Sequence, residues 1–198
     1  VVTTYHGSDI NQSKAYRFSK WAIRLSAWNI FVSQKNISKT KIKKHYSLLP
    51  CGVNISVFQP IDKMLARQQL GFDKMDKLVL FAGSFTNKVK CPELAIESVN
   101  QLKDVKLIEL KGFTRNQVAL LMNAVDVCLM TSYTEGSPQF IKEAMACNCP
   151  VVSVNVGDVA DLLENTKRGY LVERDANMIA NQLDFVIQQQ MRGDGRDK

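Results

Sequence analysis

The sequence lacks the features that would assign it at once to several common classes. No apolar run approaches the roughly 18 residues that cross a bilayer, and no G-x-G-x-x-G or Walker-type loop is present, which argues against dinucleotide dehydrogenases and P-loop NTPases. There is no Asp-x-Asp pair, so no metal site is expected. What remains is 198 residues with 45% hydrophobic and 23% charged side chains, the composition of an ordinary soluble globular protein.

Cysteine is too sparse and too irregularly spaced for a disulfide framework or a metal site. The five cysteines are an odd number, and the Cys-Asn-Cys run lacks the two-residue gap of zinc and redox pairs. Disulfides are rare in the cytosol. We therefore expect a cytosolic protein with reduced thiols at Cys51, Cys91, Cys128, Cys147 and Cys149.

Acidic residues are almost absent from the first quarter of the chain. Residues 1–48 hold nine Lys and Arg against Asp9 alone and so carry +8, which leaves −1 for the remainder of a chain whose net charge is +7. Such a region can meet nucleic acid or an anionic membrane surface. No motif for reading DNA or RNA accompanies it, which excludes nucleic acid as an expected partner and favours the membrane. A plain solvated face explains the charge equally well.

The same basic region has the pattern of two strand–helix pairs. The first helix is expected over residues 13–26, with Ser13 as its cap, and the second over residues 34–45. Apolar residues that recur at helical spacing form one face, so we expect them to pack. They are Trp21, Leu25 and Trp28.

A strand, a loop, a helix and a second strand follow one another in the third quarter of the chain. The apolar run Val125–Met130 predicts a buried strand. Ser137 is expected to cap the helix and Pro138 to open it, because Ser accepts from free N–H groups and Pro has none to leave unpaired. The helix then covers residues 139–147, and Val151–Val154 is the next strand. This order implies a parallel sheet.

The start of this helix is the most informative place in the sequence. A helix N-terminus at the carboxyl end of a parallel strand presents free N–H groups where open α/β sheets bind ligands, and it suits a phosphate. Glu135 in the loop and Glu143 in the helix can only accept hydrogen bonds, so they suit the hydroxyls of a sugar or ribose. A capped surface helix with two solvated glutamates explains the same residues about as well.

The whole string from Glu135 to Val152 is more specific than its parts. Glu135, seven residues, Glu143 and then Ala-Met-Ala-Cys-Asn-Cys-Pro-Val-Val resembles the E-x7-E segment of retaining glycosyltransferases of family 4, which have the GT-B fold. Val-Gly-Asp-Val at residues 156–159 resembles the small-residue turn of that family. The resemblance covers nearly the whole chain, and it is most specific over residues 131–158.

The resemblance implies an α/β fold. A Rossmann-like parallel sheet with helices on both faces would form the C-terminal half of a GT-B fold, beside a partial second Rossmann-like domain. Residues 1–48 are expected to close the N-terminal, acceptor-side domain and residues 49–190 to form the donor domain. Residues 191–198 would be a disordered polar tail. Because the chain opens on Val within a strand, we expect it to begin inside a longer protein.

The resemblance also assigns roles to residues. His6 is expected to line the cleft near the transferred sugar, and Glu135 to contact the hydroxyls of that sugar; these are the predicted catalytic positions. Glu143 is expected to accept from the ribose. The backbone of Gly136 and Ser137, just before Pro138, is expected to hold the donor diphosphate.

The loop over residues 84–90 is the other predicted part of the donor site. It follows an expected strand and precedes a helix, and its two lysines suit a phosphate. In the resembled family this loop carries an arginine near its start and a lysine before the helix. Lys90 matches the lysine. Ser84 stands where the arginine is usual, and Lys88 is the candidate to replace it.

The function implied is that of a retaining glycosyltransferase. It would move a sugar from a nucleotide-diphosphate sugar to a saccharide or lipid-linked acceptor by front-face substitution, without a metal or another cofactor. The expected place is the cytoplasm, with a peripheral position at the inner face of the membrane left open. Two alternatives are also left open: a sugar-nucleotide epimerase or phosphorylase-like enzyme of the same fold, and a non-catalytic nucleotide-sugar-binding domain.

Overall fold

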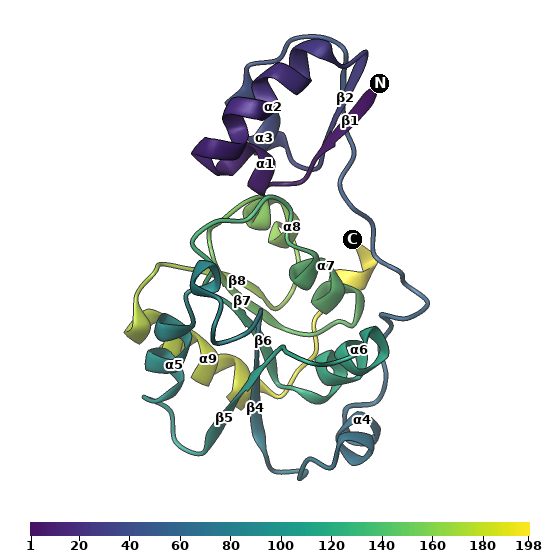
Figure 1. Ribbon diagram of the computed structural model, residues 1–198. Helices are drawn as coiled ribbons and strands as arrows, with labels where there is room; N and C mark the ends of the chain where they lie inside the picture. Colours follow the sequence, from purple (N-terminus) through teal and green to yellow (C-terminus); the bar gives the residue numbers. More distant parts are fainter.

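Two parallel sheets of unequal size organise the chain. The computed structural model describes residues 1–198. It has a three-stranded sheet in the order β1-β2-β3 and a five-stranded sheet in the order β5-β4-β6-β7-β8 (Figure 1). Every strand pair is parallel. The predicted α/β class with a parallel sheet is therefore confirmed.

The N-terminal unit is built around the smaller sheet and has a small core. Tyr5 stacks on Phe31 with ring centroids 5.0 Å apart, and Ile10 and Ile37 complete the buried cluster. A core of this size holds three strands together but leaves apolar side chains of the unit uncovered. The elements are β1 (Val2–Tyr5), α1 (Ser8–Asn11), α2 (Ser13–Leu25), β2 (Trp28–Phe31), α3 (Gln34–Thr40) and β3 (Tyr46–Leu48).

The C-terminal unit has a core of 34 buried residues. Its central strands are continuous apolar runs because helices cover both faces of the sheet. Helix α5 packs on α9, whereas α4 packs on α6 and α6 on α7, and Figure 1 shows these groups on opposite sides of the sheet. The elements are α4 (Lys63–Leu70), β4 (Lys77–Phe81), η1 (Lys88–Lys90), α5 (Pro92–Val99), β5 (Val105–Glu109), α6 (Arg115–Ala124), β6 (Val127–Met130), α7 (Gln139–Ala146), β7 (Val151–Val154), α8 (Val159–Leu163), β8 (Gly169–Val172), α9 (Ala176–Gln189) and η2 (Gly195–Asp197).

All five strands of the larger sheet run in the same direction, so the loops that follow them lie together at the carboxyl ends of the strands. These ends face the N-terminal unit (Figure 1). The connection between the units, residues 49–62, contains no helix or strand. Two side chains of α7 hold it: Gln139 donates to the carbonyl of Gly52 at 2.9 Å, and Lys142 to that of Cys51 at 3.0 Å.

Two predicted helix caps are wrong. Helix α2 begins at Ser13, so that Gln12 is the N-cap residue and no side chain caps the helix. Helix α7 begins at Gln139, and Pro138 is its N-cap in an extended conformation, with φ −71° and ψ 117°. Ser137 therefore lies one residue too far from the helix to cap it.

The helices are short throughout. The lysine-rich helix predicted over residues 34–45 is α3, which ends at Thr40, where Lys41 turns into the left-handed region with φ 57°. The longest helix, α9, has 14 residues. None of the helices combines the length and the apolar character that would let it span a lipid bilayer.

The prediction that Trp21, Leu25 and Trp28 form one packed face of a helix is wrong. Their relative exposures are 66%, 79% and 41%. Trp28 belongs to β2 rather than to a helix. Periodicity identified a face of α2 correctly, but it is the outer face. The α2 residues that pack on the core are Tyr16, Ala22 and Ile23.

The prediction of a disordered tail is also wrong. After α9 the chain folds back onto the C-terminal unit, and its two arginines each donate to three backbone carbonyl groups. Those bound by Arg192 belong to Met122, Val125 and Cys147. Those bound by Arg196 belong to Ile55, Phe58 and Ala146. The tail thereby joins the connection between the units to α7.

The five cysteines are free, as predicted. Four are buried, and Cys51 is partly exposed. The Cys128 thiol donates to the sulfur of Cys149 at 3.5 Å, and no disulfide joins the two. Burial raises the pKa of the Cys147 thiol to about 12, so this thiol stays protonated at neutral pH and unreactive.

The docked tail leads to a testable prediction. Replacing Arg192 by Ala should lower the free energy of unfolding by about 2–4 kcal/mol, because three partly buried carbonyls lose a charged donor. Urea denaturation followed by circular dichroism measures the loss. Lys111→Ala, at an exposed position, is the control and should change little. Equal stability of the two variants would show that the tail does not hold the fold.

Candidate functional site

A cavity of about 380 Å³ lies between the two units, and both contribute to its walls. From the N-terminal unit come His6, Gly7 and Asn11. From the loop between β6 and α7 come Glu135 and Ser137. Four predicted site residues thus share one cavity, although His6 lies far from the other three in the sequence; the others are Glu135, Gly136 and Ser137. The volume of the cavity lies in the range of small-molecule sites.

The loop that carries Glu135 is fixed at its start by β6. Thr131, which follows the strand directly, is fully buried and donates from its hydroxyl to the carbonyls of Lys90 and Cys91, each at 2.9 Å. This contact ties the loop after β6 to the loop after β4. The two predicted parts of the donor site are therefore held side by side by the fold.

The two loops also meet through an ion pair. Lys90 Nζ lies 2.6 Å from Glu135 Oε1, and only 23% and 15% of these side chains are exposed. Gly83 makes room for the lysine, because a Cβ there would lie 2.9 Å from Lys90 Cγ. Before any ligand is considered, the predicted phosphate ligand and the predicted sugar ligand thus neutralise each other.

Gly136 is where the two units touch. A Cβ on Gly136 would lie 3.0 Å from the carbonyl oxygen of His6, which is tighter than nine in ten real contacts of this kind. On its other side, Gly157 adopts φ 64°, and a Cβ there would lie 2.7 Å from the carbonyl oxygen of Gly136. Three stretches of backbone therefore pass one another without side chains between them, which brings His6 beside the Glu135 loop.

Several buried polar groups without hydrogen-bond partners lie near Gly136, where the three stretches of backbone cross. The side-chain amide of Asn36 in α3 is buried, and neither its oxygen nor its nitrogen has a hydrogen-bond partner; the nitrogen lies 3.7 Å from the Cβ position of Gly136. The hydroxyl of Ser137 and one carboxylate oxygen of Asp158 are also without partners. Burial raises the pKa of Asp158, and the nearby Ser137 and Lys142 oppose that rise. Such groups are rare in folded proteins, and their concentration here marks the crossing as a place for polar contacts.

Glu143 lies outside this cavity, in the second turn of α7. It is 4% exposed and accepts at 2.7 Å from Arg115, the first residue of α6. The Arg115 guanidinium in turn lies 4.7 Å from the centre of the Phe58 ring. Burial raises the pKa of Glu143, and Arg115 acts against that rise. Arg115 was missed at the level of sequence, because the pair joins residues of different helices and no local pattern signals it.

None of the three predicted phosphate ligands in the loop over residues 84–90 lines the cavity, and neither does Pro138. The Lys88 ammonium pairs with Glu93 of α5, and 81% of the lysine side chain is exposed. The Ser84 hydroxyl hydrogen-bonds Thr86 at 2.9 Å and Glu109 at 3.2 Å. Of the cations predicted in this loop, Lys90 alone reaches Glu135. No group of three His, Cys, Asp or Glu side chains in the structure could hold a metal ion.

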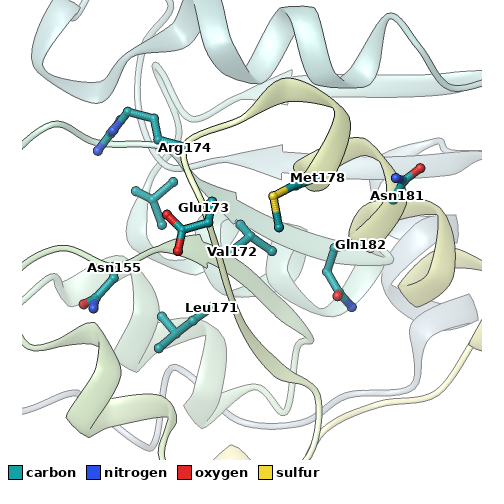
Figure 2. Close-up of a pocket in the computed structure, with 9 residues that line it drawn as sticks. Asn155, Leu171, Val172, Glu173, Arg174, Met178, Asn181 and Gln182 are labelled. Carbon is teal, nitrogen blue, oxygen red and sulfur yellow. The ribbon is translucent and has the colours of Figure 1, made fainter.

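A larger hollow, of about 790 Å³, lies beside the carboxyl ends of β7 and β8 and the start of α9 (Figure 2). None of the predicted site residues lines it. Its single cation, Arg174, is occupied: it donates to the carbonyls of Thr131 and Ser132 at 2.6 and 2.7 Å and lies 4.8 Å from the centre of the Tyr133 ring. Arg174 therefore braces the loop after β6 rather than offering a free charge to a ligand.

Comparison with known proteins agrees with this geometry. Residues 92–189 match the family model described as Glycosyl transferases group 1. TuaC of Bacillus subtilis (strain 168), whose name assigns it to teichuronic acid biosynthesis as a glycosyltransferase, is 26% identical in an alignment that covers 90% of this chain and 53% of TuaC. A D-inositol 3-phosphate glycosyltransferase of Mycobacterium marinum is 26% identical over 69% of this chain and 36% of its own length. The chain thus spans about half the length of TuaC.

Solved structures show the same fold. Sucrose-phosphate synthase from Thermosynechococcus elongatus superposes with a TM-score of 0.85 at 20% identity, over 99% of this chain and 62% of that protein. HepE of Anabaena, in complex with UDP and glucose, superposes with a TM-score of 0.77 at 19% identity, over 96% of this chain and 62% of HepE. The arrangement of the two units is therefore that of GT-B glycosyltransferases, and residues 92–189 of the chain match the family of group 1 glycosyl transferases.

Proposed function

We propose that this chain is the donor-binding half of a retaining glycosyltransferase, together with the end of its acceptor half. The observation that carries the proposal is the cavity in which His6 of one unit and Glu135 and Ser137 of the other lie together. The donor would be a nucleotide-diphosphate sugar, and the acceptor a saccharide or a lipid-linked molecule. HepE, which superposes on nearly the whole chain, is described with UDP-glucose, and this supports the class of donor. Free thiols support a place in the cytoplasm.

The diphosphate would be held at the start of α7. The backbone N–H groups of Gly136 and Ser137 precede the helix, and α7 presents its positive end there. Lys90, which pairs with Glu135 just before these two residues, would supply the cation. Negative charge develops on the diphosphate as the glycosidic bond breaks, so these groups would stabilise the transition state more than the ground state.

The two glutamates would bind hydroxyls. Glu135 shares the cavity with His6 and would orient the transferred sugar, while Glu143 would accept from the ribose. Glu135 is the one carboxylate among the predicted site residues that lines this cavity. We assign it a positioning role, with the departing phosphate assisting the acceptor on the same face. No metal ion enters this proposal.

The first prediction concerns Glu143. Glu143→Ala should weaken binding of a nucleotide sugar about tenfold or more, because a hydrogen bond to a charged group contributes roughly 1.5–3 kcal/mol. Calorimetric titration with UDP-, GDP- and ADP-sugars measures the change and identifies the base. Glu97→Ala removes an exposed glutamate of α5 and is the control. Unchanged affinity in Glu143→Ala would contradict the assignment.

The second prediction separates the two lysines of the loop. Lys90→Met should weaken binding of a nucleotide sugar about tenfold while leaving the much weaker binding of the nucleoside itself unchanged, because the lost contact is to phosphate. Lys88→Met, whose side chain is paired with Glu93 outside the cavity, should bind both as the wild type does. If Lys88→Met and Lys90→Met are equally impaired, the placement of the diphosphate is wrong.

The third prediction is a pH dependence. Glu143 must be ionised to accept from both ribose hydroxyls, and burial raises its pKa while Arg115 opposes the rise. Donor affinity should therefore fall on acidification through a pH above the ordinary glutamate pKa of about 4.3. Arg115→Ala should move that fall to a still higher pH, and Glu143→Gln should remove it. Affinity measured against pH for the three proteins is the test, and identical profiles would exclude this coupling.

Transfer itself is tested by its need for an acceptor. A retaining glycosyltransferase should release nucleoside diphosphate at a rate that rises with a saccharide or lipid-linked acceptor. Turnover of the donor at full rate without any acceptor would instead indicate an epimerase or phosphorylase-like reaction. Binding without turnover would indicate a nucleotide-sugar-binding domain.

A further inference from the structure

The outer face of α2 carries exposed apolar side chains in a regular row. Phe18, Trp21 and Leu25 are 78%, 66% and 79% exposed. They recur every three or four residues, so they lie on one face of the helix. The opposite face of α2 is the one that packs on the small core, through Tyr16 and Ile23. We call Phe18, Trp21 and Leu25 the apolar row; it points away from the sheet of its own unit.

The same helix carries only positive charge. Lys14, Arg17, Lys20 and Arg24 lie among its 13 residues, with no acidic residue. Between Lys14, Arg17, Phe18 and Trp21 the surface is hollowed, with a volume of about 380 Å³. Cations therefore border the apolar row directly.

The basic surface continues onto α3. The ammonium groups of Lys20 and Lys39 lie 4.9 and 5.9 Å from the centre of the Tyr16 ring, and the Tyr16 hydroxyl donates to the carbonyl of Lys39. Helix α3 likewise has cations and no acid. The positive charge of α2 is therefore continued on α3, along the side of α2 that carries Tyr16.

We propose that this face docks on an anionic lipid surface, with Phe18, Trp21 and Leu25 inserted at the boundary between headgroups and acyl chains. A helix with Trp, Phe and Leu on one side and Lys and Arg beside them has the composition of interfacial helices that lie in the plane of a membrane. Trp prefers this boundary because its ring is apolar and its N–H is polar. The solvated-face explanation of the basic charge does not account for three large apolar side chains in its middle.

Charge also decides between the possible occupants. A second copy of this chain would bring the same cations against the face, and like charges without acidic partners repel. Anionic phospholipid supplies both things that the face needs, an apolar layer for the row and negative headgroups for the cations. An anionic lipid surface is therefore the occupant that matches both the apolar row and the cations beside it.

The proposal places the candidate site close to the membrane. Asn11 and Gln12 line the cavity between the units, and α2 begins at the next residue. A helix of this length extends about 20 Å, so a lipid-linked acceptor would lie within reach of the cavity. This last point alone rests on the proposed transferase function; lipid binding by α2 does not.

The test uses vesicles of phosphatidylcholine with and without phosphatidylglycerol. Trp28→Phe leaves Trp21 as the sole tryptophan of the chain, which has two. Its emission should shift to shorter wavelength with the anionic vesicles and not with the neutral ones, and added salt should weaken the binding. The double variant Phe18→Ser with Trp21→Ser should sediment with anionic vesicles about tenfold more weakly. Because both side chains are exposed, its fold should be intact.

Matched controls test whether the effect belongs to the apolar row and the cations beside it, rather than to exposed apolar or basic side chains in general. Met75→Ser removes an apolar side chain that is 83% exposed on the other unit and should not change vesicle binding. Glutamine at Lys14, Arg17 and Arg24 should abolish the preference for anionic vesicles, whereas glutamine at the exposed Lys74, Lys103 and Lys111 should preserve it. Each variant should bind donor as the wild type does.

Several outcomes would overturn the proposal. They are absence of binding to either vesicle, equal binding to both, and unchanged binding by the Phe18→Ser, Trp21→Ser variant. A further outcome is that the wild type does not bind vesicles but associates with itself as its concentration rises, and that the Phe18→Ser, Trp21→Ser variant does not. That result would assign the face to contacts between copies of this chain. Loss of donor binding in the Glu143 and Lys90 variants is measured separately, so failure of the proposed function would be recognised independently.

Discussion

The geometry of the site depends on the crossing of backbones at Gly136. A Cβ at this position would press against the carbonyl oxygen of His6 at 3.0 Å, and one at Gly157 would clash with the carbonyl oxygen of Gly136 at 2.7 Å. The units can approach this closely only because no side chain separates them. The contact is supported from the side by α7, whose Gln139 and Lys142 donate to the connection between the units. One loop therefore orders Glu135, starts α7 and meets the N-terminal unit.

Pairing of charge is the second constraint on the site. Each of the two glutamates is mostly buried and has one cation: Glu135 pairs with Lys90 and Glu143 with Arg115. A buried carboxylate without such a partner would be costly and would tend to protonate. Glu143 shows both effects, since burial raises its pKa and Arg115 opposes the rise. Arg115 thereby favours the ionised form of Glu143, which is the state that accepts hydrogen bonds from hydroxyls.

The sequence allowed the central strand–loop–helix–strand order to be predicted because each boundary has a local cause. Continuous apolar runs specified β6 and β7, and proline restricted the start of α7. That His6 and Glu135 share a cavity could be expected only from resemblance to a family, because no local pattern joins residues so far apart. Arg115 was missed for the same reason. The outer face of α2 was misjudged because periodicity shows which residues share a face, not which face is covered. The tail was misjudged because polar composition does not reveal that arginines will find carbonyls to bind.

The Lys90–Glu135 pair has a consequence for the proposed donor. A diphosphate that binds Lys90 would take the partner of Glu135 and leave a carboxylate with 15% of its side chain exposed in need of a new donor of hydrogen bonds. A free nucleoside diphosphate offers none at that position, whereas a nucleotide sugar brings hydroxyls there. An unpaired buried acceptor is unfavourable. The loss of Lys90 by Glu135 is therefore compensated only when the phosphate and the sugar hydroxyls arrive in one molecule. The ion pair would thus favour the complete donor over the released product, and it would do so without any additional contact to the leaving group.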